Sequence, residues 1–133
     1  MIAAFLTIFI GATFPAVGTY AWYHFTSTTS QLSELHRLYE LRQNIVNITV
    51  ADGIIEFPSF HTTLGLLYTY IFRNETKMIF IPILILNILM IFSCVSHGGH
   101  FFVDILGGMA VFVVAVGIEQ LIFTSIKKRY LKI

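Results

Sequence analysis

Two short stretches of this 133-residue chain hold the residue types best suited to chemistry. The first reads Phe-Pro-Ser-Phe-His and ends at His61; the second, residues 93–104, contains His100 and Asp104. Each places a histidine at the start of an apolar segment that we expect to be helical. Residues four apart share a helix face, so Asp104 can reach the imidazole of His100. A carboxylate partner fixes the histidine tautomer and raises its basicity, which suits a nucleophile or an acid–base group.

Backbone groups beside these histidines suggest an anion site. Ser59 opens one expected helix, and Gly98 and Gly99 open another. Unpaired amides at helix starts bind anions, and glycine lets a ligand approach the backbone closely. These features predict a phosphate site. In it, His100 attacks phosphorus to form a phosphohistidine, while His61 protonates the departing oxygen and later activates the acceptor.

Composition indicates that a membrane surrounds these stretches. The chain is 56% hydrophobic and 11% charged, and its mean hydropathy is +0.81. These values favour a multi-span membrane protein that forms one domain over residues 1–133, and no basic run suggests nucleic acid. We therefore expect an all-α integral membrane bundle.

Four apolar segments are candidate transmembrane helices: 2–23, 59–72, 78–95 and 101–123. A crossing takes roughly 20 residues. The second segment is short, and it can cross if it is extended by two residues or if its His61 end lies in a watery recess. We expect Pro15 to kink the first segment.

The distribution of positive charge predicts the orientation. Basic residues lie between the second and third segments and at the C-terminus: Arg73, Lys77, Lys127, Lys128, Arg129 and Lys132. By the positive-inside rule both regions are cytoplasmic, as in a cell-membrane protein. The loop 25–57 and the turn 96–100 then lie together on the non-cytoplasmic face, with both histidines.

The long loop contains a predicted interfacial helix at residues 29–43, which Thr28 and Gln31 open with a capping box. Four apolar side chains share one face of it: Leu32, Leu35, Leu38 and Tyr39. Arg42 falls on the same face, where it either snorkels to water or points at an anion held between the histidines. Residues 44–53 are polar and turn-rich, as expected of an approach to the site.

The two stretches resemble the motifs of the phosphatidic acid phosphatase type 2 superfamily, which includes lipid phosphatases and inositol phosphorylceramide synthases. The second family motif is P-S-G-H. Pro58, Ser59 and His61 match it, and Phe60 replaces the glycine, as in the membrane branch that contains those synthases. The third motif is S-R-x5-H-x3-D. The chain matches it in register with Ser93, His100 and Asp104.

The resemblance implies a phosphatase or phosphotransferase for lipid-linked phosphoesters, with no metal or other cofactor. It makes His100 the nucleophile, Asp104 its partner, His61 the acid–base group, and Ser59 and Ser93 phosphate contacts. The family core is similar to a six-helix bundle. With four candidate spans, we expect this chain to be an N-terminally shortened or partial core, or one that is completed by a homo-oligomer.

Two departures bear on activity. Cys94 stands where the third motif has arginine. The first motif, K-x6-R-P, is missing, so Arg42 matches it by position alone, and His36 or Arg37 could take its place. Loss of one transition-state donor can cost roughly 10²–10³ in rate. His97, beside the glycines, either contacts phosphate or is a simple loop histidine.

Two other functions remain open. One is a catalytically silent membrane scaffold of the same family, which the cysteine and the short length favour. The other is a histidine-based metal site, because H-x3-D can hold a divalent ion. Against the metal site, we expect no further carboxylate or cysteine at ligand spacing near the outer face, because Cys94 lies within the third span.

Overall fold

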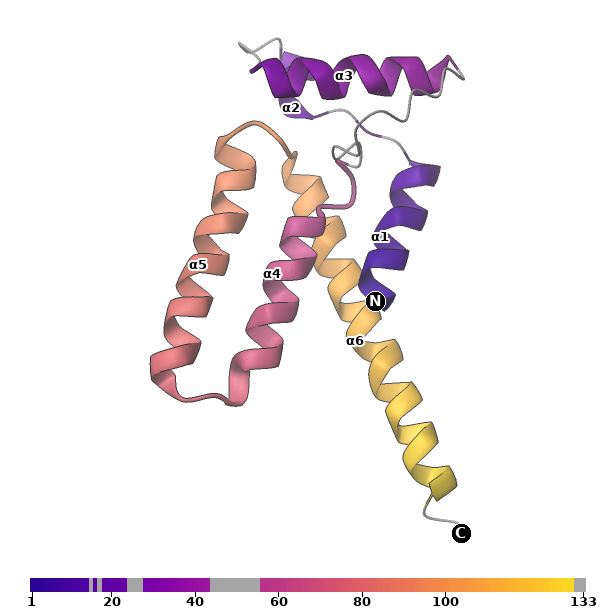
Figure 1. Cartoon of the computed structure of the whole chain (residues 1–133), viewed down its shortest axis with the longest axis vertical. Helices are drawn as coiled ribbons and strands as arrows, with labels where there is room; N and C mark the ends of the chain where they lie inside the picture. The colour runs from indigo at the N-terminus through magenta and orange to yellow at the C-terminus, as the bar shows by residue number, and fades with distance from the viewer. Residues whose placement is uncertain (15, 17, 24–27, 44–55, 131–133) are drawn as a thin grey trace.

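The computed structural model covers the whole chain and describes all residues except 15, 17, 24–27, 44–55 and 131–133 (Figure 1). The described part contains helices and no strand. In chain order these are α1 (Ile2–Thr13), α2 (Thr19–Tyr23), α3 (Thr29–Arg42), α4 (Phe60–Ile71), the single 3₁₀ turn η1 (Phe72–Asn74), α5 (Lys77–Ser96) and α6 (Phe102–Tyr130). The prediction of an all-α fold is confirmed.

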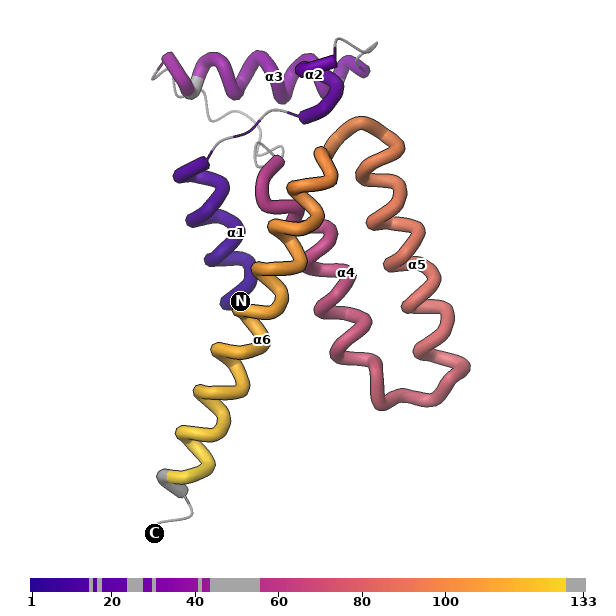
Figure 2. The backbone as a smooth tube through the Cα atoms, turned by 180° about the vertical axis from the view of Figure 1, so that it is seen from behind, coloured from indigo at the N-terminus to yellow at the C-terminus, as the bar shows by residue number. Residues whose placement is uncertain are grey.

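Helix α4 lies between α5 and the first half of α6, and α1 packs on the other side of α6 (Figures 1 and 2). Small residues line the seam between α1 and α6, where Ala3, Val111 and Ala115 form a buried apolar cluster. Helix α3 lies across one end of this bundle, with α2 beside it (Figure 1). Thr28 and Gln31 form the expected capping box, since each backbone N–H donates to the other side chain, at 2.9 and 3.3 Å.

Two of the four expected spans are long and apolar enough to cross a membrane, α5 and residues Phe102–Lys128 of α6. At ~1.5 Å per residue, the 20 residues of α5 reach about 30 Å, the thickness of a bilayer core. Every residue of α5, all of them described, is exposed or half-buried within the chain. Such an apolar helix is unlike the core helix of a soluble domain, because water would face most of its surface.

The prediction of one continuous span over residues 2–23 is wrong. Helix α1 ends at Thr13, and Phe14 leaves the helical region with φ −126° and ψ 67°. A proline follows Phe14 in the sequence, and proline disfavours helical geometry in the residue before it. The chain then begins a separate short helix, α2, at Thr19. The expected kink at Pro15 and the approach loop 44–53 lie outside the described residues.

The two histidine stretches and most of the basic residues lie at opposite ends of the helical bundle. The start of α4, the end of α5 and the start of α6 lie at the α3 end of the bundle (Figure 1). The turn from α4 to α5 and the last part of α6 lie at the opposite end, and they carry Arg73, Lys77, Lys127 and Lys128. The two histidine stretches therefore share one end of the molecule, as the charge pattern predicts.

The start of α4 meets the second turn of α6 at a glycine pair, Gly107 and Gly108. An added Cβ at Gly108 would lie 2.5 Å from the carbonyl oxygen of Ser59, and one at Gly107 would lie 2.6 Å from the ring of Phe57. Thr63 spans the same contact, because its hydroxyl lies 2.9 Å from the Gly108 carbonyl and donates to it. The two backbones thus approach as closely as they do because residues 107 and 108 have no side chain.

We expect Gly108→Ala to weaken this junction. The new methyl group displaces the start of α4, at a cost of ~1–3 kcal/mol. Thermal unfolding in detergent, followed by circular dichroism, should show a lower Tm.

Gly117→Ala is the matched control, since it lies on the same helix with no atom within 4 Å of the added Cβ. It should keep or raise the Tm, because alanine is the better helix former by up to ~1 kcal/mol. Equal losses in the two variants would contradict the close packing.

Candidate functional site

His61 is the second residue of α4, and its position depends on the residues before it. Ser59 is the N-cap of α4. Its backbone N–H donates to the carbonyl of Asp104 at 3.0 Å, and its hydroxyl lies 3.1 Å from that of Thr62. Ser59 has 0% exposure. The structure thus places Ser59 as a buried cap, and the exposed imidazole of His61 projects from a helix start that is held to α6.

His100 lies in the turn between α5 and α6. Gly98, with φ +74°, ends α5, and its N–H donates to the carbonyl of Val95 at 3.0 Å. A left-handed residue, most often glycine, is a common way to end a helix. The His100 N–H then donates to the carbonyl of Cys94 at 3.2 Å. His100 as a whole is 7% exposed in this turn.

The expectation that Gly98 opens a helix with a free amide is wrong, because that amide is already hydrogen-bonded at the end of α5. The Gly98 carbonyl instead anchors α2. It accepts from the Tyr20 N–H at 3.2 Å and from the Thr19 hydroxyl. Gly18, just before α2, approaches the carbonyl of Gly99 too closely to leave room for a side chain.

Asp104 approaches His100 by a different route from the one expected. His100 precedes α6 by two residues, so the two do not share a helix face. Asp104 lies in the first turn, where its carboxylate accepts from the Phe101 N–H at 2.7 Å and so caps the helix start. The same oxygen, Oδ2, lies 3.6 Å from Nδ1 of His100. Asp104 is 2% exposed, so the carboxylate and the imidazole are buried together.

Sequence reasoning missed Glu56. One of its carboxylate oxygens, Oε2, lies 3.4 Å from Nδ1 of His100. Nδ1 itself is buried and makes no hydrogen bond of good geometry to any described group. It faces two carboxylates at 3.4 and 3.6 Å, which favours placing its proton there and leaving Nε2 as the free lone pair. The one signal in the sequence was an acidic residue two positions before Pro58.

Burial and charge shift the protonation of this pair. Burial raises the pKa of Glu56 to about 7, against the opposing effect of His100. Burial lowers the pKa of His100, but its interaction with Asp104 and the charges of Glu56 and Asp104 outweigh that effect, and the net pKa is raised. The carboxylates therefore stabilise the imidazolium form of His100.

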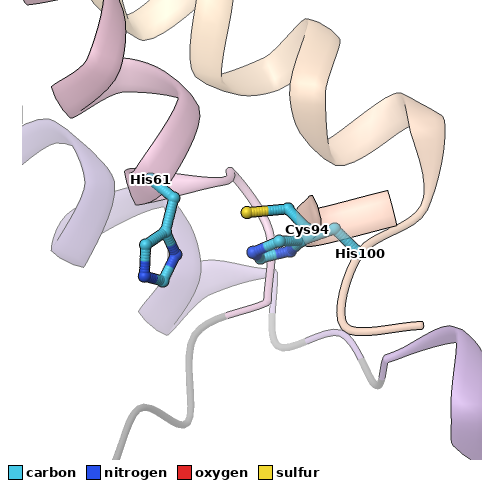
Figure 3. A group of neighbouring side chains, drawn as sticks. All are labelled: His61, Cys94 and His100. Carbon is cyan, nitrogen blue, oxygen red and sulfur yellow. The ribbon is translucent and has the colours of Figure 1, made fainter. Parts of the chain in front are cut away.

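The two histidines meet, as the motifs predict. Their ring centroids lie 6.1 Å apart with 60° between the ring planes. Cys94 joins them from the last turn of α5, and its side chain and that of His100 both point toward His61 (Figure 3). One ligand atom from each of the three residues lies within 4.8 Å of the other two. Cys94 lies within α5, as expected, but the expectation that no cysteine has ligand spacing to the histidines is wrong.

The remaining candidates occupy varied positions. The exposed Ser93 hydroxyl donates to the carbonyl of Met90 at 2.8 Å, within its own helix. The carbonyl of His97 accepts from the Gln31 side chain of α3 at 3.4 Å, while its imidazole is exposed. Arg42 is the last residue of α3, and its side chain is exposed. Roles for these residues in binding phosphate stay predictions.

Comparison with known families identifies the chain. The model of the PAP2 superfamily, the phosphatidic acid phosphatase type 2 proteins, matches residues 1–118. The chain belongs to this superfamily. Membership suggests a phosphatase-type function, since the superfamily generally comprises phosphatases and phosphotransferases. No curated protein and no solved structure matches the chain.

We expect Glu56→Gln to lower the pKa of His100, because the neutral amide removes a negative charge that stabilises the imidazolium. NMR titration of histidine-labelled protein in detergent, with a chelator present, measures this shift. Glu119→Gln, an exposed substitution on α6 15 residues beyond Asp104 and hence ~22 Å along the helix, should leave it unchanged. A His100 pKa that is equal in both variants would argue against the contact with Glu56.

Proposed function

We propose that this PAP2 protein hydrolyses or transfers lipid-linked phosphoesters through a phosphohistidine on His100. The observation that carries the proposal is the approach of His61 to His100, at 6.1 Å between ring centroids, from two different segments of a chain of this superfamily. The short distance lets both imidazoles reach one phosphoryl group.

In the first step, Nε2 of His100 attacks phosphorus in line with the ester oxygen. The N–P bond forms as the P–O bond breaks, and His61 donates a proton to the departing alkoxide. Nδ1 of His100 keeps its proton. The positive charge that develops on the ring is stabilised by Glu56 and Asp104, which lie 3.4 and 3.6 Å from Nδ1.

In the second step, His61 is neutral and acts as a base. It takes a proton from water, or from a lipid alcohol, as that oxygen attacks phosphorus. The N–P bond breaks, and His100 is restored as a neutral imidazole. Hydrolysis and transfer differ only in which oxygen reaches the intermediate.

The orientation of the helices in the bilayer would determine where a lipid substrate meets the two histidines. We propose that α1, α4, α5 and α6 lie in the bilayer with α3 at its surface, and that the histidine end faces the non-cytoplasmic side. The exposed apolar surface of α5 supports this arrangement, as do the basic residues at the other end of the bundle. A lipid headgroup in that leaflet then lies level with His61 and His100.

The decisive test is phosphate release from phosphatidic acid or diacylglycerol pyrophosphate by the purified protein in detergent, with a chelator present. We expect His100→Ala to abolish turnover and to abolish the phosphoenzyme, which in the wild type should be labile to acid and stable to base. We expect His61→Ala to retain the nucleophile and to lower kcat by ~10²–10⁴.

His36→Ala is the control for both variants. The structure pairs His36 with Glu40 on α3, at 3.4 Å from Nδ1 to the carboxylate, and leaves its side chain 75% exposed. We therefore place it outside the site and expect no loss of rate on its replacement. Equal turnover in wild type and His100→Ala would overturn the mechanism. A folded wild-type protein without turnover on either lipid would favour the silent scaffold.

We expect Cys94→Arg to raise kcat, because a guanidinium at this position supplies the positive donor of the family motif, worth up to ~10² in rate. Cys94→Lys should gain less, since an ammonium lacks the planar fork that pairs with two phosphoryl oxygens. Phosphate release measures both. A fall in rate with arginine would show that the cysteine position does not face the phosphoryl group.

A further inference from the structure

Three ligand side chains converge from three parts of the fold. His61 comes from the start of α4, Cys94 from the last turn of α5, and His100 from the turn before α6. Their ligand atoms lie within 4.8 Å of one another. The fold thus gathers two imidazoles and the chain's single thiol at one end of the bundle (Figure 3).

We propose that His61, Cys94 and His100 bind a soft divalent cation, and that Zn²⁺ fits best. Imidazole nitrogen and thiolate sulfur are the donors that Zn²⁺ prefers. Three protein ligands leave a fourth tetrahedral position for water or another oxygen. Binding replaces the thiol proton with the metal and releases that proton to solvent.

The spacing needs only a small adjustment. In a tetrahedral site with Zn–N bonds of about 2.0–2.1 Å and a Zn–S bond of about 2.3 Å, the ligand atoms lie roughly 3.3–3.6 Å apart. From the present spacing, each ligand atom moves about 1 Å or less toward the centre. His61 is exposed and at the start of its helix, so its side chain is free of close packing on that side.

The surroundings of His100 suit a metal ligand. Its Nδ1 faces the carboxylates of Glu56 and Asp104, so Nε2 is the nitrogen left to bind a metal. A carboxylate behind a ligating imidazole orients the ring and increases its donor strength. The two acidic groups also offset the charge of the cation.

Cys94 determines the kind of ion. In the family motif this position holds arginine, whose fixed positive charge repels a cation. A thiol at the same position becomes an anionic ligand when it loses its proton. The same exchange therefore weakens phosphate binding and creates a metal site. Because the metal occupies the lone pairs of both imidazoles, zinc binding and phosphorylation of His100 exclude each other.

The test uses purified full-length protein, in detergent and without a histidine tag. Titration with Zn²⁺ alone should give one ion per chain by calorimetry and elemental analysis. Co²⁺ in its place should give the near-ultraviolet charge-transfer band of a cobalt–thiolate bond. The chain has one cysteine, so this band can arise only from Cys94.

Cys94→Ser should remove the band and weaken Zn²⁺ binding at least ~10-fold. His61→Ala should weaken Zn²⁺ binding similarly, and its exposed position lets the variant fold. His36→Ala, which removes the imidazole of a separate histidine–glutamate pair on α3, should leave the stoichiometry and affinity unchanged.

Absence of the thiolate band, or wild-type Zn²⁺ affinity in Cys94→Ser, would overturn the metal site. These measurements need no phosphate substrate, so their outcome is separate from that of the proposed function. If the protein releases phosphate in the presence of a chelator and shows no cobalt–thiolate band, only the proposal of a metal site is overturned. If the protein binds Zn²⁺ through Cys94 and releases no phosphate, the metal site is supported and the proposed enzyme mechanism is overturned.

Discussion

The close contact between the start of α4 and the first two turns of α6 is the constraint on which the site depends. Gly108 lets the backbone of Ser59 approach α6, and Gly107 leaves room for the ring of Phe57. The Ser59 N–H then donates to the carbonyl of Asp104. This bond ties the segment before His61 to the segment after His100. The separation of the two imidazoles is therefore set by backbone contacts in the packed interior, and it does not depend on long side chains.

Much of this arrangement could be predicted from the sequence. The spacing of the two motifs leaves room for one helix away from the histidine end and one helix back, so both histidines return to the same end. The capping box of α3 was equally readable, because caps depend on residues only three positions apart. Mean hydropathy could not predict that α1 ends at Thr13. It averages over apolar residues, and it contains no information on the backbone geometry that a proline imposes on the residue before it.

The details of the site were less accessible, because they arise from contacts between distant segments. Glu56 lies 44 positions before His100, and no local pattern pairs an acidic residue in an irregular segment with that imidazole. Ser59 matches a phosphate-binding motif by type, yet its burial follows from packing against α6. Cys94 lies within a helix, as expected, but its approach to both histidines could not be predicted, because that spacing follows from packing between separate segments.

The acidic surroundings of His100 bear on what this end of the bundle can hold. Two carboxylates approach Nδ1, and a neutral thiol replaces the motif arginine nearby. Together these groups favour a positive partner, either a proton on the imidazole or a metal ion, more than the same motifs would with arginine present. The phosphoryl transfer proposed above would therefore rely on the histidines and on positive charge from the substrate or its surroundings.

The Asp104 carboxylate has two roles in the structure: it caps α6 by accepting from the Phe101 N–H, and it lies close to the His100 ring. The carboxylate thus has a structural use at position 104 that does not depend on catalysis. An aspartate there is evidence of how the helix begins, and the two histidines are the residues that bear on turnover.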